Sequence, residues 1–312
     1  MTSPVVPILT IAAGWTACAL FVHLRGRERL APMRQVADHS TFLAPYNAFV
    51  YLFSSVENRP MLDVGRFPEL APLRAGWETI RDEALALHRS GHLTKPARHD
   101  DLAFNSFYKR DWRRFYVKWY GDVVPSARRL CPRTAALVAG VPGVHAAMFA
   151  LLAPRSHLVR HRDPFAGSLR YHLGLVVPDP ARCRILVDGV PYHWHEGEAV
   201  LFDETYIHRA ENQTDDVRII LFCDVERPLR GRLATAINRF AIRHVMRATA
   251  TANVPGDPVG VLNRLFERVY TVRLLAKRIK ARSRTTYYVL SYAAKLAPIA
   301  ALAWLALRSV RP

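Results

Sequence analysis

Cysteine is scarce in this sequence, and its few cysteines form no pattern that binds a metal or cross-links a fold. Four cysteines occur among 312 residues, widely spaced and with no C-x-x-C pair. This excludes a zinc ribbon and a disulfide framework, and scattered thiols are typical of a reducing compartment. Internal repeats and low-complexity segments are absent as well. The chain is long enough for one sizeable domain with appendages, or for two small domains.

Acidic residues are the second shortage. The chain has 26 Asp and Glu against 44 Lys and Arg, which gives a formal net charge of +18. Such an excess indicates an anionic partner, whether nucleic acid, an anionic membrane or an acidic substrate. Between Arg227 and Arg284 there are 14 basic residues and two acids, so most of the excess lies on one flank. This flank adjoins an apolar tail and shows no nucleic-acid-binding motif, so we expect an anionic membrane surface and no nucleic acid as its partner.

Charged residues are missing altogether from Pro4 to Leu24. About 20 apolar residues cross the core of a bilayer, so this stretch is long enough to span. A signal peptide would carry basic residues before its apolar run, whereas Arg25, Arg27 and Arg29 follow it here. We therefore expect residues 1–29 to form an uncleaved membrane anchor, with the rest of the chain in the cytoplasm. A buried core helix is the alternative.

A second apolar stretch closes the sequence. Residues 286–307 carry Lys295 as their only charge. A lysine at the bilayer centre costs roughly 2.5–3.5 kcal/mol on insertion scales, and the apolar segment after it is too short to span as a helix. We expect 285–312 to be a hydrophobic membrane segment that either spans or lies in the interface. Residues 231–284 are expected to form a basic, helical, membrane-proximal region.

The middle of the chain changes from a helical to a β-rich texture. We expect residues 30–145 to form a helical and mixed flank, with helices over 76–91 and 125–140 and an aromatic strand over 112–122. Residues 146–230 contain short β-rich runs separated by turn signals, at 168–178, 184–194, 198–204 and 217–225. This spacing predicts a mainly β fold with a jelly-roll core, flanking helices and hydrophobic terminal membrane segments.

The β-rich region also contains the residues that carry chemistry. His161 and Asp163 stand at i and i+2 on one face of an extended segment, and His208 follows 45 residues after Asp163. Two histidines and a carboxylate are the facial triad of non-haem iron(II) oxygenases, which leaves positions for a chelating keto-acid and for O₂. Each residue is ordinary by itself, but their order within a predicted barrel favours an iron site. His193 and His195 are a competing pair, which we interpret as part of a solvated hairpin.

Arg218 stands ten residues after His208 in an otherwise apolar strand. A charged residue that faces the interior of a barrel needs a partner, and a guanidinium pairs bidentately with a carboxylate. The distal carboxylate of 2-oxoglutarate is a suitable partner. Arg170 and His172 alternate on one predicted strand, so they share a face and can add hydrogen bonds to the same co-substrate.

Two segments resemble the metal-binding blocks of the aspartyl/asparaginyl β-hydroxylase family, HRDPFAGSLRYHLGLVVP at 161–178 and FDETYIHRAENQTDDVRIILFCDVERP at 202–228. Within the family, the likeness is greatest to bacterial lipid A 2-hydroxylases. Further similar segments lie at 38–54, 104–122, 130–137 and 284–290, so the resemblance covers nearly the whole chain. It implies a double-stranded β-helix that uses Fe(II), 2-oxoglutarate and O₂ to hydroxylate the 2-position of a secondary acyl chain of lipid A.

The resemblance also implies roles for individual residues. It makes His161 and His208 iron ligands and Arg218 the anchor of the 2-oxoglutarate carboxylate. The residues that it adds to the same pocket are Arg170, His172 and Trp112. The animal protein-hydroxylating members have Gly where this chain has Asp163, so a full triad is expected here.

Substrate and location are expectations from the resemblance and from the two apolar ends. We expect a lipid substrate at the bacterial inner membrane, with the catalytic domain on the cytoplasmic side. Ornithine-lipid acyl hydroxylation is a near alternative. A protein β-hydroxylase acting on Asp or Asn would not need membrane anchors, and a cupin-like module without catalysis would have a closed metal site. The sequence leaves the lipid, the acyl chain and the oligomeric state open.

Overall fold

The computed structural model describes residues 5–36, 38–96, 101–104, 111–287 and 289–290. The chain divides after Asn263 into two compact units. The first unit contains every strand of the described residues, and the second contains most of helix α10 (Val261–Arg282). Residues 291–312 lie outside the described part, so the predicted C-terminal membrane segment stays a prediction.

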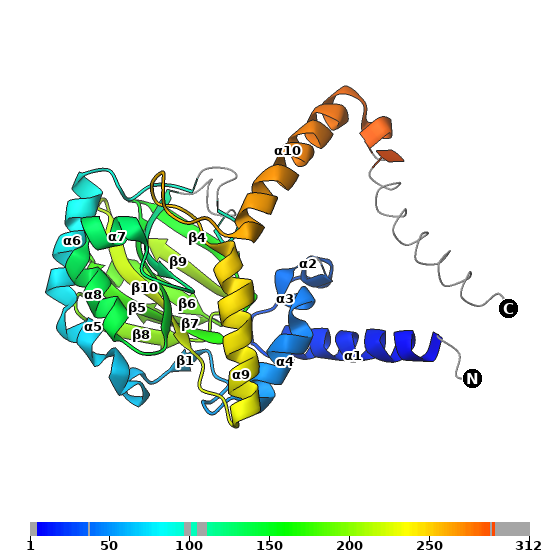
Figure 1. Ribbon diagram of the computed structural model, residues 1–312, viewed down its shortest axis with the longest axis horizontal. Helices are drawn as coiled ribbons and strands as arrows, with labels where there is room; N and C mark the ends of the chain where they lie inside the picture. The colour runs from blue at the N-terminus through cyan, green and yellow to red at the C-terminus, as the bar shows by residue number, and fades with distance from the viewer. Residues whose placement is uncertain (1–4, 37, 97–100, 105–110, 288, 291–312) are drawn as a thin grey trace. The chain divides into compact units, whose positions relative to one another are not determined.

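Within the described residues, ten strands form two antiparallel sheets (Figure 1). The larger sheet has the order β1-β8-β5-β10-β3-β2, and the smaller has the order β4-β9-β6-β7. The strands are β1 Met61–Leu62, β2 Trp112–Trp119, β3 Val144–Leu152, β4 Ser156–His161, β5 Ser168–Val176, β6 Cys183–Val187, β7 Val190–His193, β8 Ala199–Phe202, β9 His208–Asn212 and β10 Arg218–Glu226. Strands distant in sequence are neighbours in both sheets, which is the topology of a jelly roll. The predicted mainly β, jelly-roll core is confirmed.

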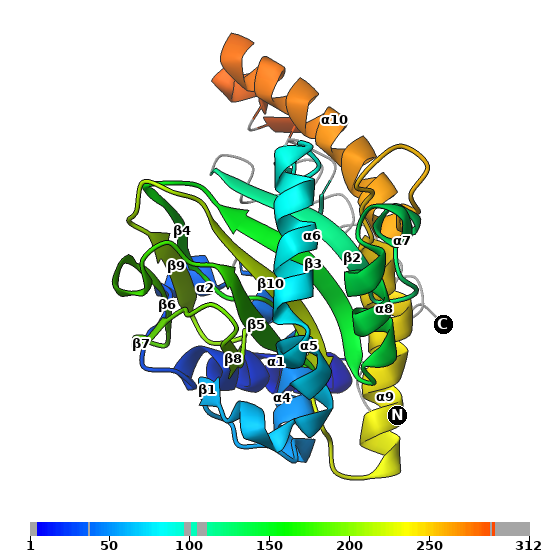
Figure 2. The same cartoon turned by 90° about the vertical axis from the view of Figure 1, so that its left-hand side faces the viewer.

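Helices surround this core. They are α1 Val5–Leu24, α2 Pro32–Val36, α3 His39–Phe42, α4 Ala44–Phe53, α5 Ala71–Ala75, α6 Trp77–Arg89, α7 Pro125–Leu130, α8 Pro132–Gly140 and α9 Arg232–Ala241, which a π-helical turn, η5 Ile242–Met246, continues. Helix α6 contacts β5, and α8 contacts β2 and β3. Figure 2 shows these helices in front of the larger sheet, so they shield one of its faces from water.

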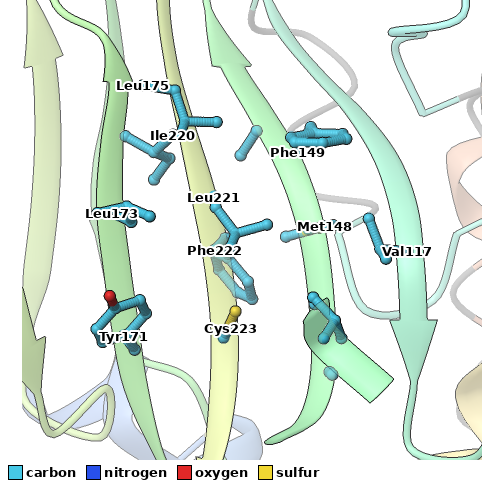
Figure 3. Close-up of a cluster of buried hydrophobic side chains, with 14 of the residues drawn as sticks. Val117, Met148, Phe149, Tyr171, Leu173, Leu175, Ile220, Leu221, Phe222 and Cys223 are labelled. Atoms are coloured by element: carbon cyan, nitrogen blue, oxygen red, sulfur yellow. The ribbon is translucent and has the colours of Figure 1, made fainter. Parts of the chain in front are cut away.

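The alternation of side chains on β5 and β10 separates a core from a cavity. Both strands are buried along almost their whole length. Tyr171, Leu173 and Leu221 belong to one set of alternating positions, and they are part of the cluster of buried hydrophobic side chains that Figure 3 draws along β5, β10, β3 and β2. Because successive side chains of a strand point to opposite faces, Arg170 and His172 point the other way. The polar residues predicted for the site therefore face the interior between the two sheets.

Two of the predicted elements are confirmed, and a third is interrupted. Helix α6 and strand β2 fall within the predicted ranges 76–91 and 112–122. The helix predicted over 125–140 is two helices, α7 and α8, with Cys131 between them. Pro132 explains the break, because proline disfavours the helical conformation for the residue before it and lacks the N–H of a helix interior.

The predicted strand over 184–194 is a hairpin of β6 and β7. Asp188 and Gly189 form its two-residue turn, and both have positive φ. That geometry belongs to the type I′ turn, for which Asp-Gly is a preferred sequence. Strands β3, β4 and β9 were not predicted as separate elements. His208 begins β9.

The end of α1 packs against the core rather than standing apart from it. Val22 is buried in a small cluster with Ala44, Val50 and Tyr51 from α4 and its start, and with Ala166 from the loop that follows Asp163. Among the residues that the structure describes, no helix is both long enough and apolar enough to cross a membrane. The membrane anchor predicted for residues 1–29 is not confirmed.

Candidate metal centre and co-substrate cavity

The predicted triad comes together at one end of the smaller sheet. His161 ends β4, His208 begins β9, and the two residues are direct partners in the antiparallel register. Their ring centroids lie 4.3 Å apart. One ligand atom from each of His161, Asp163 and His208 lies within 4.8 Å of the others, so the three residues are close enough together that they could hold one metal ion. Sequence order suggested the set, and the pairing of β4 with β9 assembles it.

Both histidines are oriented by main-chain carbonyls. Nδ1 of His161 lies 2.7 Å from the carbonyl oxygen of Val159, and Nδ1 of His208 lies 3.0 Å from that of Tyr206. A ring N–H donated to a carbonyl fixes the tautomer and makes Nε2 the metal-binding atom. Burial, with His161 nearby, lowers the pKa of His208 to about 3. Its imidazole is therefore neutral at physiological pH, which is the form that binds metals.

Asp163 is held as a carboxylate. Burial opposes its ionisation, but Arg170 and the two histidines outweigh this and keep the pKa of Asp163 below its ordinary value. Nη1 of Arg170 lies 2.9 Å from Oδ2 of Asp163. The backbone N–H of Asp163 donates to the carbonyl oxygen of Glu204, at 2.9 Å. The side chain that completes the triad is thus fixed in both position and charge.

Arg170 serves this carboxylate network. Besides Asp163, its guanidinium pairs with Glu204 and, through Nε at 2.7 Å, with Asp224, which faces it across the β5–β10 ladder. The hydroxyl of Tyr120 also donates to Asp224, at 2.7 Å. We expected Arg170 to assist the co-substrate. The structure shows that three carboxylates of the chain pair with it, and one of them is Asp163, so Arg170 also holds the triad carboxylate in place.

Arg218 has the opposite surroundings. It is 2% exposed, and its Nε and Nη1 have no hydrogen-bond partner within the described residues. Its guanidinium lies 4.4 Å from the centroid of the Trp194 ring. Burial without an anionic neighbour lowers the pKa of Arg218 to about 10, so the group stays charged at physiological pH. A buried, charged and unpaired guanidinium is costly unless a ligand supplies the anion.

The triad and Arg218 line one cavity between the two sheets. Its polar side chains also include His172 and the indole of Trp194, and its apolar side chains include Trp112 and Phe222. Both ring nitrogens of His172 and Nε1 of Trp194 are buried with no hydrogen-bond partner in the described part of the chain. Burial and the two nearby arginines lower the pKa of His172 well below its usual value, so this ring is neutral. The predicted placement of Trp112 in this cavity is confirmed.

Trp194, between His193 and His195, is a cavity residue that the sequence analysis did not single out. Nδ1 of His193 lies 2.8 Å from the carbonyl oxygen of Pro180, and His195 is exposed. Neither joins the triad, in agreement with our interpretation of a hairpin. Trp194 between them is fully buried in the cavity. An indole flanked by polar residues was the available signal, because tryptophan rarely stands in an exposed turn.

The N-terminal segment reaches the site as well. Arg25 pairs with Asp203 and donates to Oγ1 of Thr205 at 2.7 Å, and its guanidinium lies 4.1 Å from the Tyr206 ring centroid. These residues form the loop that leads into His208. Arg162, between two triad residues, donates to the carbonyl oxygen of Val22 at 3.1 Å.

The sequence analysis used Arg25 only as a flank of the apolar stretch, whereas the structure also gives it partners inside the fold. Its side chain is 8% exposed and its charge is compensated inside the fold. Arg227 lies 2.7 Å from the same carboxyl group. Burial opposes ionisation of Asp203, but Arg227 and Arg25 outweigh it and keep the pKa of Asp203 below its usual range. The residues after the apolar helix belong to the support of the metal centre.

Comparisons with known proteins agree with this geometry. The family model described as aspartyl/asparaginyl beta-hydroxylase matches residues 74–228. A curated relative from Rhizobium tropici, described as an ornithine lipid ester-linked acyl 2-hydroxylase, is 34% identical over 213 residues, which are 66% of this chain and 75% of that protein. The chain belongs to the aspartyl/asparaginyl β-hydroxylase family. Segments 161–178 and 202–228, which include the candidate triad and Arg218, lie within the matched residues.

Other members of the aspartyl/asparaginyl β-hydroxylase family are much longer. The human aspartyl/asparaginyl beta-hydroxylase is 29% identical over 162 residues, which are 50% of this chain but 21% of the human protein. Among solved structures, a Pseudomonas putida prolyl-4-hydroxylase is similar with a TM-score of 0.34 and 19% identity, over 51% of this chain and 87% of that one. The jelly-roll assignment rests on the strand order and not on this likeness.

Proposed function

We propose that this chain is an Fe(II)- and 2-oxoglutarate-dependent dioxygenase that hydroxylates an ester-linked acyl chain of a membrane lipid. The observation that carries the proposal is the pairing, within one cavity, of a His161, Asp163 and His208 cluster with the unpaired guanidinium of Arg218. A hydroxylase of this class needs a metal and a dicarboxylate side by side. The chain itself belongs to a hydroxylase family.

The donor set suits ferrous iron. Two neutral imidazoles and one carboxylate are the ligands of the facial triad, and a structural site would instead be closed by a fourth protein ligand. His161, Asp163 and His208 would hold the metal, and bound iron would supply the activation of O₂. Arg170 keeps Asp163 ionised and aimed at the two histidines.

The polar atoms without partners suit 2-oxoglutarate. Arg218 would receive its distal carboxylate through a charge-assisted pair. His172 and the Trp194 N–H line the same cavity and would add hydrogen bonds, so each orphaned group gains a partner. Filling the cavity in this way also excludes water from the metal.

Homology supports a lipid substrate over a protein side chain. The Rhizobium tropici relative is described by its action on the ester-linked acyl chain of ornithine lipid, and its match extends over more of this chain than that of the human protein. We expected lipid A from the sequence resemblance, and ornithine lipid is the second candidate with direct support. Protein β-hydroxylation is the third.

The proposed location follows from the substrate. Long acyl chains reside in a bilayer, so the enzyme must work at its surface. We propose anchoring through residues 1–29 and 285–312, with the catalytic unit on the cytoplasmic face of the bacterial inner membrane. The basic residues 231–284 lie beside anionic lipid in this arrangement, and each contributes roughly 1 kcal/mol.

The metal assignment is tested by single alanine variants. Purified protein should convert 2-oxoglutarate to succinate and CO₂ only with Fe(II) and O₂, and His161→Ala or His208→Ala should abolish this turnover. His157→Ala, an exposed histidine on the same strand as His161, is the matched control and should keep it. Near-normal turnover in either triad variant would remove that residue from the metal site.

The substrate is tested by mass spectrometry of total lipids from cells with and without the protein. A gain of one oxygen on lipid A supports the first candidate, and a gain on ornithine lipid supports the second. A shift on neither lipid, together with a hydroxylated peptide, would favour the protein β-hydroxylase reading.

A further inference from the structure

The exposed apolar side chains of the first unit are concentrated on a few contacting helices. These helices are α1, α3, α4 and α9 with its continuation η5. Outside them and the start of α10, the described part of this unit exposes one large hydrophobic side chain, Val190. Helix α4 contacts both α1 and α9, and Figure 1 draws α9 crosswise to α1. We define the α4–α9 face by Leu52, Phe53, Leu233, Ile237 and Phe240. A soluble surface seldom gathers its apolar residues in this way.

Helix α9 has one side buried against the core and another apolar side exposed to solvent. Ala234 and Asn238 are buried against the core. Leu233, Ile237 and Phe240 are spaced i, i+4 and i+7, so they share one side, where they are 74%, 38% and 63% exposed. No described element covers them. An amphipathic surface helix normally buries its apolar face, but α9 has a second apolar face that is exposed to solvent.

The surroundings of this face are basic. Residues 227–256 contain six arginines and no acidic residue. Arg227 pairs with Asp203, and Arg239 pairs with Glu226. The other four arginines are exposed and have no ion pair in the described part of the chain; they are Arg230, Arg232, Arg243 and Arg247. A hollow along α9 is lined by Arg232, Arg239 and Arg243 together with His244 and Phe240. Converging guanidinium groups suit a phosphate.

We propose that the α4–α9 face docks on an anionic lipid bilayer, with its apolar side chains at the acyl boundary and the arginine hollow on a headgroup phosphate. An apolar stripe beside a basic stripe is the signature of a helix that lies in the membrane interface. A protein partner would need matching acids and a complementary surface, whereas a bilayer of anionic lipid supplies both charge and apolar contact without them. This inference deepens the proposed function and rests on its lipid substrate.

Docking at this face would place the membrane against the supports of the metal loop. The side chain of Asn47 on α4 donates to the carbonyl oxygen of Pro164 at 2.8 Å and accepts from the N–H of Ala166 at 3.0 Å. Asn238 on α9 donates to the carbonyl oxygen of Gly167, at 3.0 Å. The loop that follows Asp163 is therefore held by the same two helices that carry the docking face.

A pair of labelled variants tests the docking. Ile237→Cys and Val190→Cys replace side chains of nearly equal exposure, 38% and 36%, on α9 and on the β6–β7 hairpin. Each is made in the full chain with Cys18→Ser, since the other three cysteines are buried, and carries an environment-sensitive fluorophore. With vesicles of phosphatidylethanolamine and phosphatidylglycerol, we expect a blue shift and quenching by brominated lipid at 237 and neither at 190. Vesicles of phosphatidylcholine alone should give a weaker response.

Several outcomes would overturn the proposal. A label at 237 that stays in water while the protein floats with the vesicles shows that the chain binds by its ends only. A blue shift that grows with protein concentration in the absence of vesicles assigns the face to a second copy of the chain. An equal response to inorganic phosphate alone assigns the hollow to a free anion, and equal responses to the two vesicle types remove the role of charge.

Charge and apolar contact can be separated by substitution. Arg232→Gln and Arg243→Gln should each weaken partition onto phosphatidylglycerol vesicles about fivefold. The double variant Leu233→Glu with Phe240→Glu should lower lipid hydroxylation roughly tenfold or more, while 2-oxoglutarate turnover without lipid is unchanged, and Val190→Glu should alter neither. Unchanged lipid hydroxylation in the double variant contradicts the docking. Absence of 2-oxoglutarate turnover in the unmodified protein contradicts the proposed function and leaves the fluorescence test intact.

Discussion

The two ends of the cavity each contain one buried arginine from the larger sheet, and they differ in what surrounds it. At the metal end, Arg170 on β5 is paired with Asp163, Glu204 and Asp224. At the other end, Arg218 on β10 has Trp194 beneath it and no carboxylate within the described residues. A compensated charge supports the protein that surrounds it. An uncompensated buried charge destabilises the protein without ligand, and it becomes favourable only when an anion binds to it.

This contrast separates architecture from recognition without reference to relatives. The same residue type, on adjacent strands of one sheet, serves two purposes according to its neighbours. At the metal end, the guanidinium of Arg170 already has its anionic partners within the chain. The opposite end has three polar side chains, Arg218, His172 and Trp194, with five nitrogen atoms that nothing in the described chain satisfies. Matched substitutions at the two ends should therefore have opposite consequences.

The largest effect is expected from Arg170→Met. The change leaves three carboxylates in the interior without their counter-charge, and breaking a buried pair of this kind costs about 3–5 kcal/mol. Urea denaturation should show that loss, and iron affinity should fall because Asp163 is no longer held. A variant as stable as the unmodified protein would mean that another group compensates the three carboxylates and that Arg170 does not stabilise the metal end.

Arg218→Met is the matched change at the other end, with a different expectation. Removing an unpaired buried charge should leave the free energy of unfolding unchanged or raise it. Affinity for 2-oxoglutarate should fall by about 2–3 kcal/mol, roughly 30- to 150-fold, because a charge-assisted pair is lost. Arg218→Lys keeps the charge but not the bidentate fork, so its affinity for 2-oxoglutarate should lie between that of the unmodified protein and that of Arg218→Met. Equal loss of iron and co-substrate affinity would show that Arg218 supports the fold.

The same two arginines show which features of the fold and the candidate site could be predicted from the sequence. The burial of Arg218 could be predicted because a lone charge stood in an apolar strand, and such a charge needs a partner that the strand does not supply. The triad could be predicted because its three residues have a characteristic chemistry and order. The β core could be predicted because alternation and turn residues are local signals, which the Asp188–Gly189 hairpin illustrates.

The partners of Arg170 could not be predicted in that way. Glu204 and Asp224 lie 34 and 54 positions beyond it, and only the pairing of β5 with β8 and β10 brings them together. The same holds for Arg25, whose partner Asp203 is 178 positions away. Local pattern reports which residues are buried, but the cross-strand register decides which charges meet. The sequence argument could place Arg170 on one face with His172, but it could not find the three carboxylates that pair with it.

A smaller effect is expected from Arg25→Met, which tests whether the metal end is braced from the N-terminal segment. Asp203 keeps Arg227, so the loss should be near the value of one charged hydrogen bond, about 1.5–3 kcal/mol, and less than for Arg170→Met. The loop that leads to His208 should loosen, and iron affinity should fall by up to roughly tenfold to a hundredfold. Isothermal titration with Fe(II) without oxygen measures this directly. Unchanged iron affinity would confine Arg25 to stability.

The smallest effect, and the finest test of the comparison, comes from Trp194→Phe. The substitution removes the indole N–H and keeps an aromatic ring beneath Arg218, so packing and the cation–π contact largely remain. Because Nε1 has no partner in the described chain, stability should hardly change, whereas the affinity for 2-oxoglutarate should fall by about 0.5–1.5 kcal/mol, roughly 2- to 12-fold. Trp119→Phe is the control, since the N–H of Trp119 already donates to Oγ1 of Thr249 at 3.0 Å. That variant should lose stability by a similar amount and leave the Michaelis constant for 2-oxoglutarate in place. If both variants lowered stability and neither changed the requirement for 2-oxoglutarate, the unpaired indole would not belong to the co-substrate site, and the recognition end of the cavity would shrink to Arg218 and His172.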